Sequence, residues 1–127
     1  MEGDYLLFNS RDEMLRMRLQ NIVYFESNGN YTYMVTINKL RPAVHMNLSN
    51  IEKMIESKLR EKRGAFMRVG RKYIINRNYL YMISPAKQRL VLSDQSTFAY
   101  QLNVSKEALV KMKNLLAGIS KNKQGVV

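Results

Sequence analysis

Apolar and polar residues alternate along much of the chain with the two-residue period of half-buried β-strands. In Met14–Leu19 the apolar side chains fall on one side of such a strand, whereas Arg16 and Arg18 fall on the other. The pattern predicts strands at Tyr5–Phe8, Met14–Leu19, Ile22–Glu26, Tyr31–Ile37, Phe66–Val69, Tyr73–Ile75, Tyr79–Ser84, Arg89–Leu92 and Thr97–Leu102. Pro42 lacks the N–H that a central strand needs, so the segment from Pro42 to Met46 is predicted to lie at a sheet edge.

Turn residues separate these segments. Ser27–Asn30 contains an Asn-Gly pair, which tolerates the positive φ angles of a tight hairpin turn. This predicts a hairpin between Ile22–Glu26 and Tyr31–Ile37. Further turns are predicted at Asn38–Lys39, Ser84–Lys87 and Ser93–Gln95.

Two segments have the period of a helix instead. From Leu48 to Leu59 the apolar residues recur at helical spacing, with Asn47 as a predicted N-cap and Gly64 just beyond the end. A second helix closes the chain after Ser105, which can cap it. The apolar stripe of this second helix is predicted to comprise Leu109, Met112, Leu115, Leu116 and Ile119. The elements together predict a mostly β chain of the α+β class.

Composition narrows the function. The chain has 127 residues, 46% of them hydrophobic, which fits one domain with a real core. It has no Cys, so disulfide scaffolds, Cys-based zinc sites and thiol catalysis are excluded. No apolar stretch is long enough to span a bilayer, and the acidic N-terminus, Met1–Asp4, is unlike a secretory signal. We therefore expect neither secretion nor a membrane-spanning segment, and a membrane is not the expected partner.

Positive charge is concentrated in one part of the chain. The net charge is +11, and no acidic residue occurs between Glu61 and Asp94. The cations in that window are Lys62, Arg63, Arg68, Arg71, Lys72, Arg77, Lys87 and Arg89. A basic segment without internal carboxylates either forms a solvated face or binds the phosphate groups of a partner. Tyr and Phe residues between these cations favour a nucleic-acid partner, although aromatic strand residues also fill cores.

Two segments carry a specific resemblance. The residues from Ile22 to Thr32 (IVYFESNGNYT) and from Phe66 to Asn76 (FMRVGRKYIIN) resemble the two signature stretches of the LytTR family of bacterial DNA-binding domains. A weaker third element follows at Leu90–Leu92 and Leu102–Lys106. The resemblance covers about residues 5–117. It implies about ten strands in short antiparallel sheets with one short central helix and a C-terminal helix, forming a single domain over residues 1–127 with a flexible tail at 118–127.

The resemblance also implies where DNA binds. In this family three loops, rather than a recognition helix, enter the major groove. Carried onto this sequence, the base-reading residues are expected to be Arg71, Thr32, Tyr31, Lys106 and Ser105. Arg71 leads because a guanidinium can donate two hydrogen bonds to guanine. The expected phosphate contacts are Lys72, Arg68, Asn28, Asn30 and Arg77.

The second signature departs from the family pattern. It commonly has His before the basic residue and Ser after it, where this chain has Gly70 and Lys72. Base reading there would pass to Arg71 or Lys72. Asn76 is predicted to be structural, with its amide satisfying backbone groups at a strand end.

Family members usually serve as output domains of bacterial response regulators and bind promoter sites built as paired direct repeats. The resemblance therefore implies a cytoplasmic transcription regulator that binds duplex DNA, with two copies on adjacent half-sites. The sequence predicts no receiver domain before the first strand, which is expected to begin at Tyr5. It leaves open a stand-alone regulator or an output domain that answers an upstream receiver or a partner kinase pathway.

Other functions have weaker support. RNA or non-specific nucleic-acid binding is the main alternative, because Tyr31, Tyr33 or Tyr73 could stack on unpaired bases. The basic C-terminal helix could instead lie on a membrane surface or a partner helix. An enzyme is not expected, since His45 is the only histidine and the glycines form no phosphate-binding cluster. Glu52, Glu56 and Glu61 are expected to form local ion pairs, with neighbours such as Lys53 and Lys58, rather than a metal site; no cofactor is expected.

Overall fold

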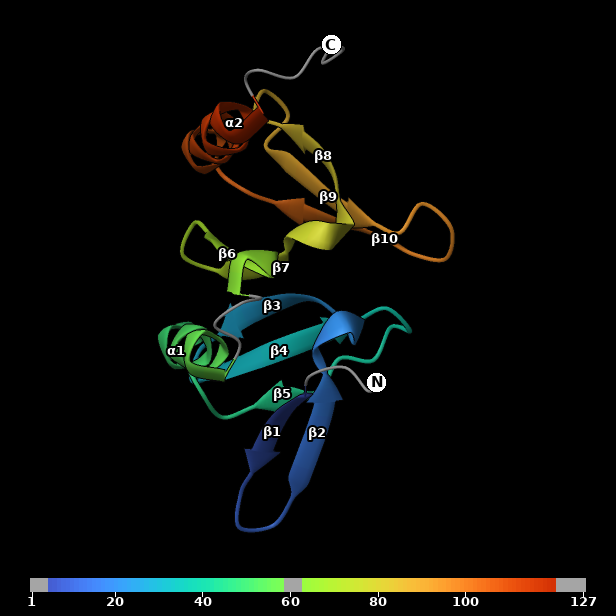
Figure 1. The fold of residues 1–127 in the computed structure, drawn as a ribbon, viewed down its shortest axis with the longest axis vertical. Coiled ribbons are helices and arrows are strands. Elements are labelled where there is room, and N and C mark those ends of the chain that lie inside the picture. Colours follow the sequence, from blue (N-terminus) through green and yellow to red (C-terminus); the bar gives the residue numbers. More distant parts are fainter. Residues whose placement is uncertain (1–4, 59–62, 121–127) are drawn as a thin grey trace.

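The fold is known from a computed structural model, which describes residues 5–58 and 63–120. Ten strands and two α-helices follow one another along this part of the chain (Figure 1). The strands are β1 (Tyr5–Asn9), β2 (Met14–Arg18), β3 (Ile22–Asn28), β4 (Tyr31–Thr36), β5 (Ala43–Val44), β6 (Phe66–Val69), β7 (Tyr73–Asn76), β8 (Leu80–Ser84), β9 (Arg89–Ser93) and β10 (Ala99–Asn103). The helices are α1 (Leu48–Lys58) and α2 (Lys106–Ser120), and short 3-10 helices precede β3, β6 and β8.

The strands form three small antiparallel sheets. The largest has the order β5-β4-β3-β7-β6, a three-stranded sheet has the order β10-β9-β8, and β1 pairs with β2. Figure 1 shows the β1–β2 hairpin at one end of the molecule and the three-stranded sheet with α2 at the other. The predicted mostly β fold with short antiparallel sheets, a central helix and a C-terminal helix is confirmed.

The predicted hairpin forms at β3 and β4. Asn28 pairs with Tyr31, so the loop consists of Gly29 and Asn30 alone. Gly29 has a φ of 62°, a conformation that costs a glycine little. The Asn-Gly signal therefore located the turn correctly, although β3 extends two residues further than predicted.

The five-stranded sheet is buried on both faces, which explains its nearly continuous apolar runs. On one face, Phe25, Met34 and Ile74 pack with α1 and the β1–β2 hairpin. On the other face, Tyr24, Val35 and other side chains pack with the three-stranded sheet and α2. A register shift between Ile22 and Tyr24 interrupts the alternation of β3. As a result Val23 joins the same cluster as its neighbour Tyr24.

Both predicted helix caps are present. The Oδ1 atom of Asn47 accepts the N–H of Asn50 at 2.9 Å, and the Ser105 Oγ accepts the N–H of Ala108 at 3.2 Å. In α2, Leu109 and Met112 are buried as predicted. The prediction for Leu115 is wrong, because 58% of this residue is exposed. Leu116 is partly buried against the same cluster, as predicted, and Ala108 also packs there. The side chain of Ile119 lies outside the described residues.

Several strand boundaries also differ from prediction. The edge strand β5 spans only two residues, and Tyr79 ends a 3-10 helix before β8 begins. The last strand starts at Ala99 rather than Thr97, because the Asp94 carboxylate accepts the N–H groups of Ser96, Thr97 and Phe98. These bonds hold the segment as a turn. The predicted frayed tail and Leu59 lie outside the described residues.

Candidate nucleic-acid interface

Three loops that are far apart in sequence lie next to one another. The N–H of Ser27, at the end of β3, donates to the carbonyl oxygen of Lys72 at 2.8 Å, which joins the β3–β4 hairpin to the β6–β7 loop. Gly70, in the same loop, has a φ of 60°, and a Cβ at this position would lie 3.9 Å from the Cβ of Ala108. The loop therefore also lies against the first turn of α2 (Figure 1).

The β6–β7 loop presents Arg71. Its side chain is exposed and forms no ion pair with any residue in the described ranges 5–58 and 63–120. Beside it, Arg68 is held in place: its guanidinium donates to the Glu52 carboxylate at 3.3 Å and to the carbonyl oxygen of Arg71 at 3.2 Å. Glu52 thus pairs across the fold, and not with the expected neighbours on its own helix. The Arg68 side chain is thus held by bonds to the protein, whereas the Arg71 side chain, three residues later, has no ion pair among the described residues.

Lys72 lies beside a carboxylate. Its Nζ is 3.4 Å from Glu26, and Arg41 contacts the other oxygen of the same carboxylate at 3.2 Å. The Arg41 guanidinium also lies 4.0 Å from the centre of the Tyr33 ring, a cation–π contact. Arg41 was not among the predicted contacts, because nothing in its local pattern indicates that the chain returns it to β3 and β4.

The β3–β4 hairpin tip carries three of the predicted contacts. Asn28, Asn30 and Tyr31 are all exposed. The Asn28 amide donates to the Tyr33 hydroxyl at 3.3 Å. The Tyr31 ring lies 4.9 Å from that of His45, centre to centre, with 31° between the ring planes.

Thr32 does not belong to this surface. It is fully buried, and its hydroxyl donates to the carbonyl oxygen of Met46 at 2.6 Å. The expectation that Thr32 reads a base is contradicted by this placement. The strand period explains the difference: Tyr31 points outward, so the next residue points inward. There it satisfies a backbone carbonyl on the segment that leads into α1.

The start of α2 supplies the third group. Ser105 and Lys106 are both exposed. The Ser105 hydroxyl already caps the helix by accepting the N–H of Ala108. Lys106 has no side-chain hydrogen bond or ion pair within the part of the chain that the structure describes, so of these two residues it is the better placed to contact DNA.

Arg77 is separate from the three loops. It follows the far end of β7 from Lys72, five residues and roughly 16 Å away along an extended strand. Its guanidinium donates to the carbonyl oxygen of Gly64 at 2.9 Å. The structure thus groups the other exposed predicted contacts but not Arg77.

Asn76 has the structural role that the sequence predicted. Only 2% of it is exposed; its Nδ2 donates to the carbonyl oxygen of Ile22 at 2.9 Å, and its Oδ1 accepts the N–H of Asn78 at 3.0 Å. The side chain therefore joins β3 to the turn after β7. Removing it would leave two backbone groups without partners.

The tyrosines divide into two sets. Tyr24, Tyr73 and Tyr100 pack edge to face behind the loops, with ring centres less than 6 Å apart in the two pairs that Tyr24 forms. Burial raises the pKa of Tyr24 to about 12, and the Glu26 carboxylate adds to the shift. Burial also raises the pKa of Tyr73, with Glu26 adding to the effect and Lys72 opposing it. Because Tyr73 is buried, it is not available to stack on a base, whereas Tyr31 is half exposed.

The described residues show neither a metal-binding cluster nor a membrane-spanning helix. Within residues 5–58 and 63–120, no three His, Asp or Glu side chains gather closely enough to hold a metal ion. None of the helices in this part of the chain is both long and apolar enough to cross a membrane.

Comparisons with known proteins give a consistent result. The family model for the LytTr DNA-binding domain matches residues 12–117. A solved structure described as the LytTr DNA-binding domain of a methyl-accepting/DNA response regulator from Bacillus cereus is similar, with a TM-score of 0.61. The likeness covers 88% of this chain and 95% of that chain at 19% sequence identity, so it concerns the fold. No curated protein matches the sequence.

Proposed function

The chain belongs to the LytTR family of DNA-binding domains, and from this premise we propose that it binds duplex DNA sequence-specifically through the three adjoining loops. As a member of this family, the chain functions in DNA binding and transcription regulation. The finer proposal concerns which residues make the contacts and how the protein occupies its target.

The observation that carries the proposal is the exposure of Arg71 beside the other two loops. Because the Arg71 guanidinium forms no ion pair within residues 5–58 and 63–120, two of its N–H groups are free to donate to guanine O6 and N7 in the major groove. Gly70 places the loop backbone against α2 and contributes no side chain. Arg71 is therefore assigned the leading base contact, with Tyr31 and Lys106 at the flanking loops.

Phosphate contacts are assigned to the residues around Arg71. Lys72 is exposed, with its Nζ 3.4 Å from Glu26, and Asn28 and Asn30 occupy the hairpin tip. Arg68 supports the loop, because its guanidinium bonds the carbonyl oxygen of Arg71. We therefore assign Arg68 mainly to supporting the loop, and its predicted phosphate contact is secondary. Phosphate contacts fix the register of the protein on DNA, whereas base contacts provide specificity.

We further propose that two copies bind directly repeated half-sites in a bacterial promoter, in the cytoplasm. The resemblance of the sequence to output domains of response regulators supports this arrangement. The Bacillus cereus domain comes from a protein described as a response regulator, which is consistent with control by an upstream receiver or a partner kinase pathway.

Selection of bound duplexes from a randomised pool at near-physiological salt tests the proposal. We expect enrichment of a short motif that occurs twice, in direct repeat at fixed spacing. The matched control is Arg71→Ala, which should enrich a motif with a relaxed position. A pool without any enriched motif would contradict sequence-specific binding, and tighter binding of single-stranded RNA than of any duplex would favour the RNA alternative.

A further inference from the structure

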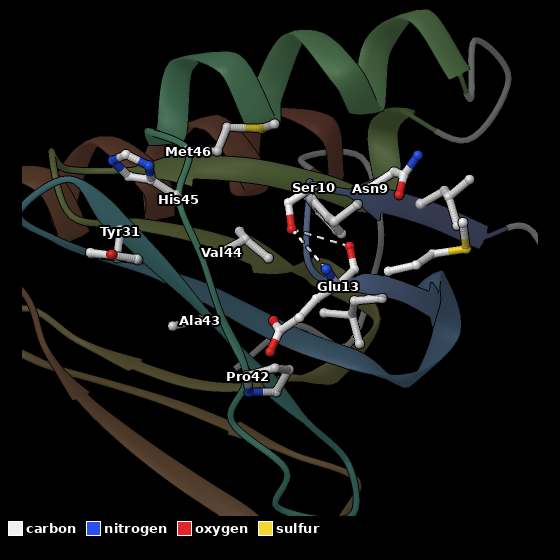
Figure 2. Close-up of a pocket in the computed structure, with 13 residues that line it drawn as sticks. Asn9, Ser10, Glu13, Tyr31, Pro42, Ala43, Val44, His45 and Met46 are labelled. Atoms are coloured by element: carbon white, nitrogen blue, oxygen red, sulfur yellow. Dashed lines mark hydrogen bonds between the residues drawn. The ribbon is translucent and has the colours of Figure 1, made fainter.

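A second surface lies between the β1–β2 hairpin and the edge strand β5. There an open cleft of about 870 Å³ is bounded on one side by residues of the hairpin and on the other by the segment Pro42–Met46 (Figure 2). This volume lies within the range of small-molecule sites, about 300 to 1,000 Å³. The walls come from segments about thirty residues apart in the sequence.

The cleft is lined by apolar side chains that the fold leaves in solvent. Leu7 is 46% exposed, Met14 is 65% exposed and Tyr31 is 50% exposed, and all three line it. Large exposed apolar side chains that gather in one concave place mark a binding surface more strongly than the same side chains scattered singly.

The charge of the cleft is opposite to that of the chain. The protein carries 21 Lys and Arg against 10 Asp and Glu, yet no Lys or Arg lines the cleft. Glu13 is the one acidic residue in its lining, and it forms no ion pair within the described residues. Within this lining, the Glu13 carboxylate favours a ligand with a cationic group.

The backbone of Glu13 is held by hydrogen bonds within its own turn. Its carbonyl oxygen accepts the N–H of Ser10 at 2.8 Å and the Ser10 hydroxyl at 3.1 Å, and its N–H donates to that hydroxyl at 3.2 Å. Figure 2 shows the carboxylate directed toward Pro42, across the cleft. At the other end of the cleft, the rings of Tyr31 and His45 form an aromatic wall.

We propose that this cleft binds a small molecule with a flat apolar body and a protonated amine at one end. The amine pairs with the Glu13 carboxylate, and the apolar body lies along Leu7 and Val44 toward the ring of Tyr31. Aromatic ligands fit this wall, because ring faces stack and also attract cations.

Occupation of the cleft should weaken DNA binding, and this part of the inference rests on the proposed function. Tyr31 follows directly after Asn30 at the hairpin tip and belongs to both surfaces. A ligand that covers the Tyr31 ring competes with a base or sugar for the same ring.

The first experiment requires no DNA. Naphthylethylamine, naphthylethanol and naphthylpropionate are titrated into the protein while backbone amide resonances are followed by NMR. We expect the amine to shift the amides of Ser10, Glu13, Ala43 and His45, and to bind about fivefold more tightly than the carboxylate, as a partly exposed ion pair allows. Glu13→Gln should abolish this preference, whereas Glu56→Gln, which removes an exposed carboxylate from α1, should leave it intact.

Equal binding of amine and carboxylate, a preference that survives Glu13→Gln, or shifts confined to other apolar residues such as Leu115 would overturn the proposed site. The second experiment repeats the titration with a selected duplex. Weaker DNA binding in the presence of the amine supports the coupling, and unchanged DNA binding at a saturated cleft overturns it. Failure to bind any duplex would instead contradict the proposed function, because the first experiment measures the cleft alone.

Discussion

The two signature segments contain residues of two kinds, those of the loop surface (Asn28, Asn30, Tyr31, Arg71 and Lys72) and those of the scaffold behind it (Tyr24, Thr32, Asn76 and, partly, Arg68). The loop residues are exposed, and Arg71 forms no ion pair with any other described residue. Thr32 and Asn76 are buried and have their polar atoms bonded to backbone groups. Residues that occur together in a motif therefore perform separate tasks.

This difference gives a rule for reading such motifs. A side chain that already satisfies a buried backbone group costs stability when it is changed, whereas an unbonded exposed cation costs affinity for its ligand. Scaffold variants should lower the free energy of unfolding and keep the preferred DNA sequence. Loop variants should keep stability and change DNA binding.

The largest expected effect is on the scaffold, at Asn76. Asn76→Ala leaves the Ile22 carbonyl and the Asn78 N–H without partners, and should lower the free energy of unfolding by about 3 kcal/mol. Urea denaturation measures this. A variant as stable as the unmodified protein would mean that Asn76 does not hold the strands together. It would contradict the distinction between scaffold and loop residues.

Tyr24 gives a pH-dependent test of the same scaffold. Burial raises its pKa from 10.0 to about 12, so above pH 10 the unfolded chain loses this proton before the folded one does. The stability is therefore complete below pH 10 and declines by roughly 2 kcal/mol as the pH rises to about 12. Tyr24→Phe should flatten this part of the stability profile, measured by denaturation at a series of alkaline pH values. An unchanged slope would show that Tyr24 ionises freely in the fold.

On the loop surface, the largest effect is expected at Arg71. Arg71→Ala should weaken binding to the selected duplex by about 1 to 3 kcal/mol, roughly 5- to 150-fold, with little change for a scrambled duplex. Fluorescence anisotropy with both duplexes measures this, and thermal unfolding should be unchanged. If both duplexes lost affinity by the same factor, Arg71 would be a phosphate contact and not a base reader.

Thr32 separates the two kinds of residue most directly, because it lies next to Tyr31. Thr32→Val keeps the shape but removes the hydroxyl that bonds the Met46 carbonyl, and should cost about 1 kcal/mol of stability. The enriched DNA motif should stay the same in a repeated selection. An altered motif with unchanged stability would restore Thr32 as a base-reading residue.

The smallest effect is expected at Lys72. Lys72→Ala should weaken target and scrambled duplexes alike by a few fold, and should reduce the slope of log affinity against log salt concentration by about 0.9. Stability should change little, because Lys72 is largely exposed and Glu26 keeps Arg41 as a partner. A loss confined to the target duplex would assign Lys72 to base reading.

Much of the fold was predictable because it depends on local patterns. Strand and helix periods, the Asn-Gly turn and the caps at Asn47 and Ser105 all depend on residues within a few positions of one another. The structure confirms each of these elements, with boundaries shifted by a few residues. Asn76 was also assigned correctly, since an amide at a strand end has a common structural use.

Other features could not be predicted from local patterns. The partner of the Thr32 hydroxyl is the carbonyl of Met46, fourteen residues away, and no local pattern indicates that this bond forms. The exposure of Leu115 depends on how much of α2 the sheets cover. Arg41 reaches Glu26 and Tyr33 only because the chain turns back after β4.

The sequence by itself determined the class of fold, the positive charge and the two signature segments that identify a LytTR domain. Short-range sterics, hydrogen bonding and periodic burial are sufficient for these properties. Only the tertiary structure decided which signature residues face solvent, which loops adjoin, and that an acidic apolar cleft lies beside a basic loop surface. Those properties arise from contacts between distant segments, because a side chain is buried or exposed by whatever the rest of the chain places against it.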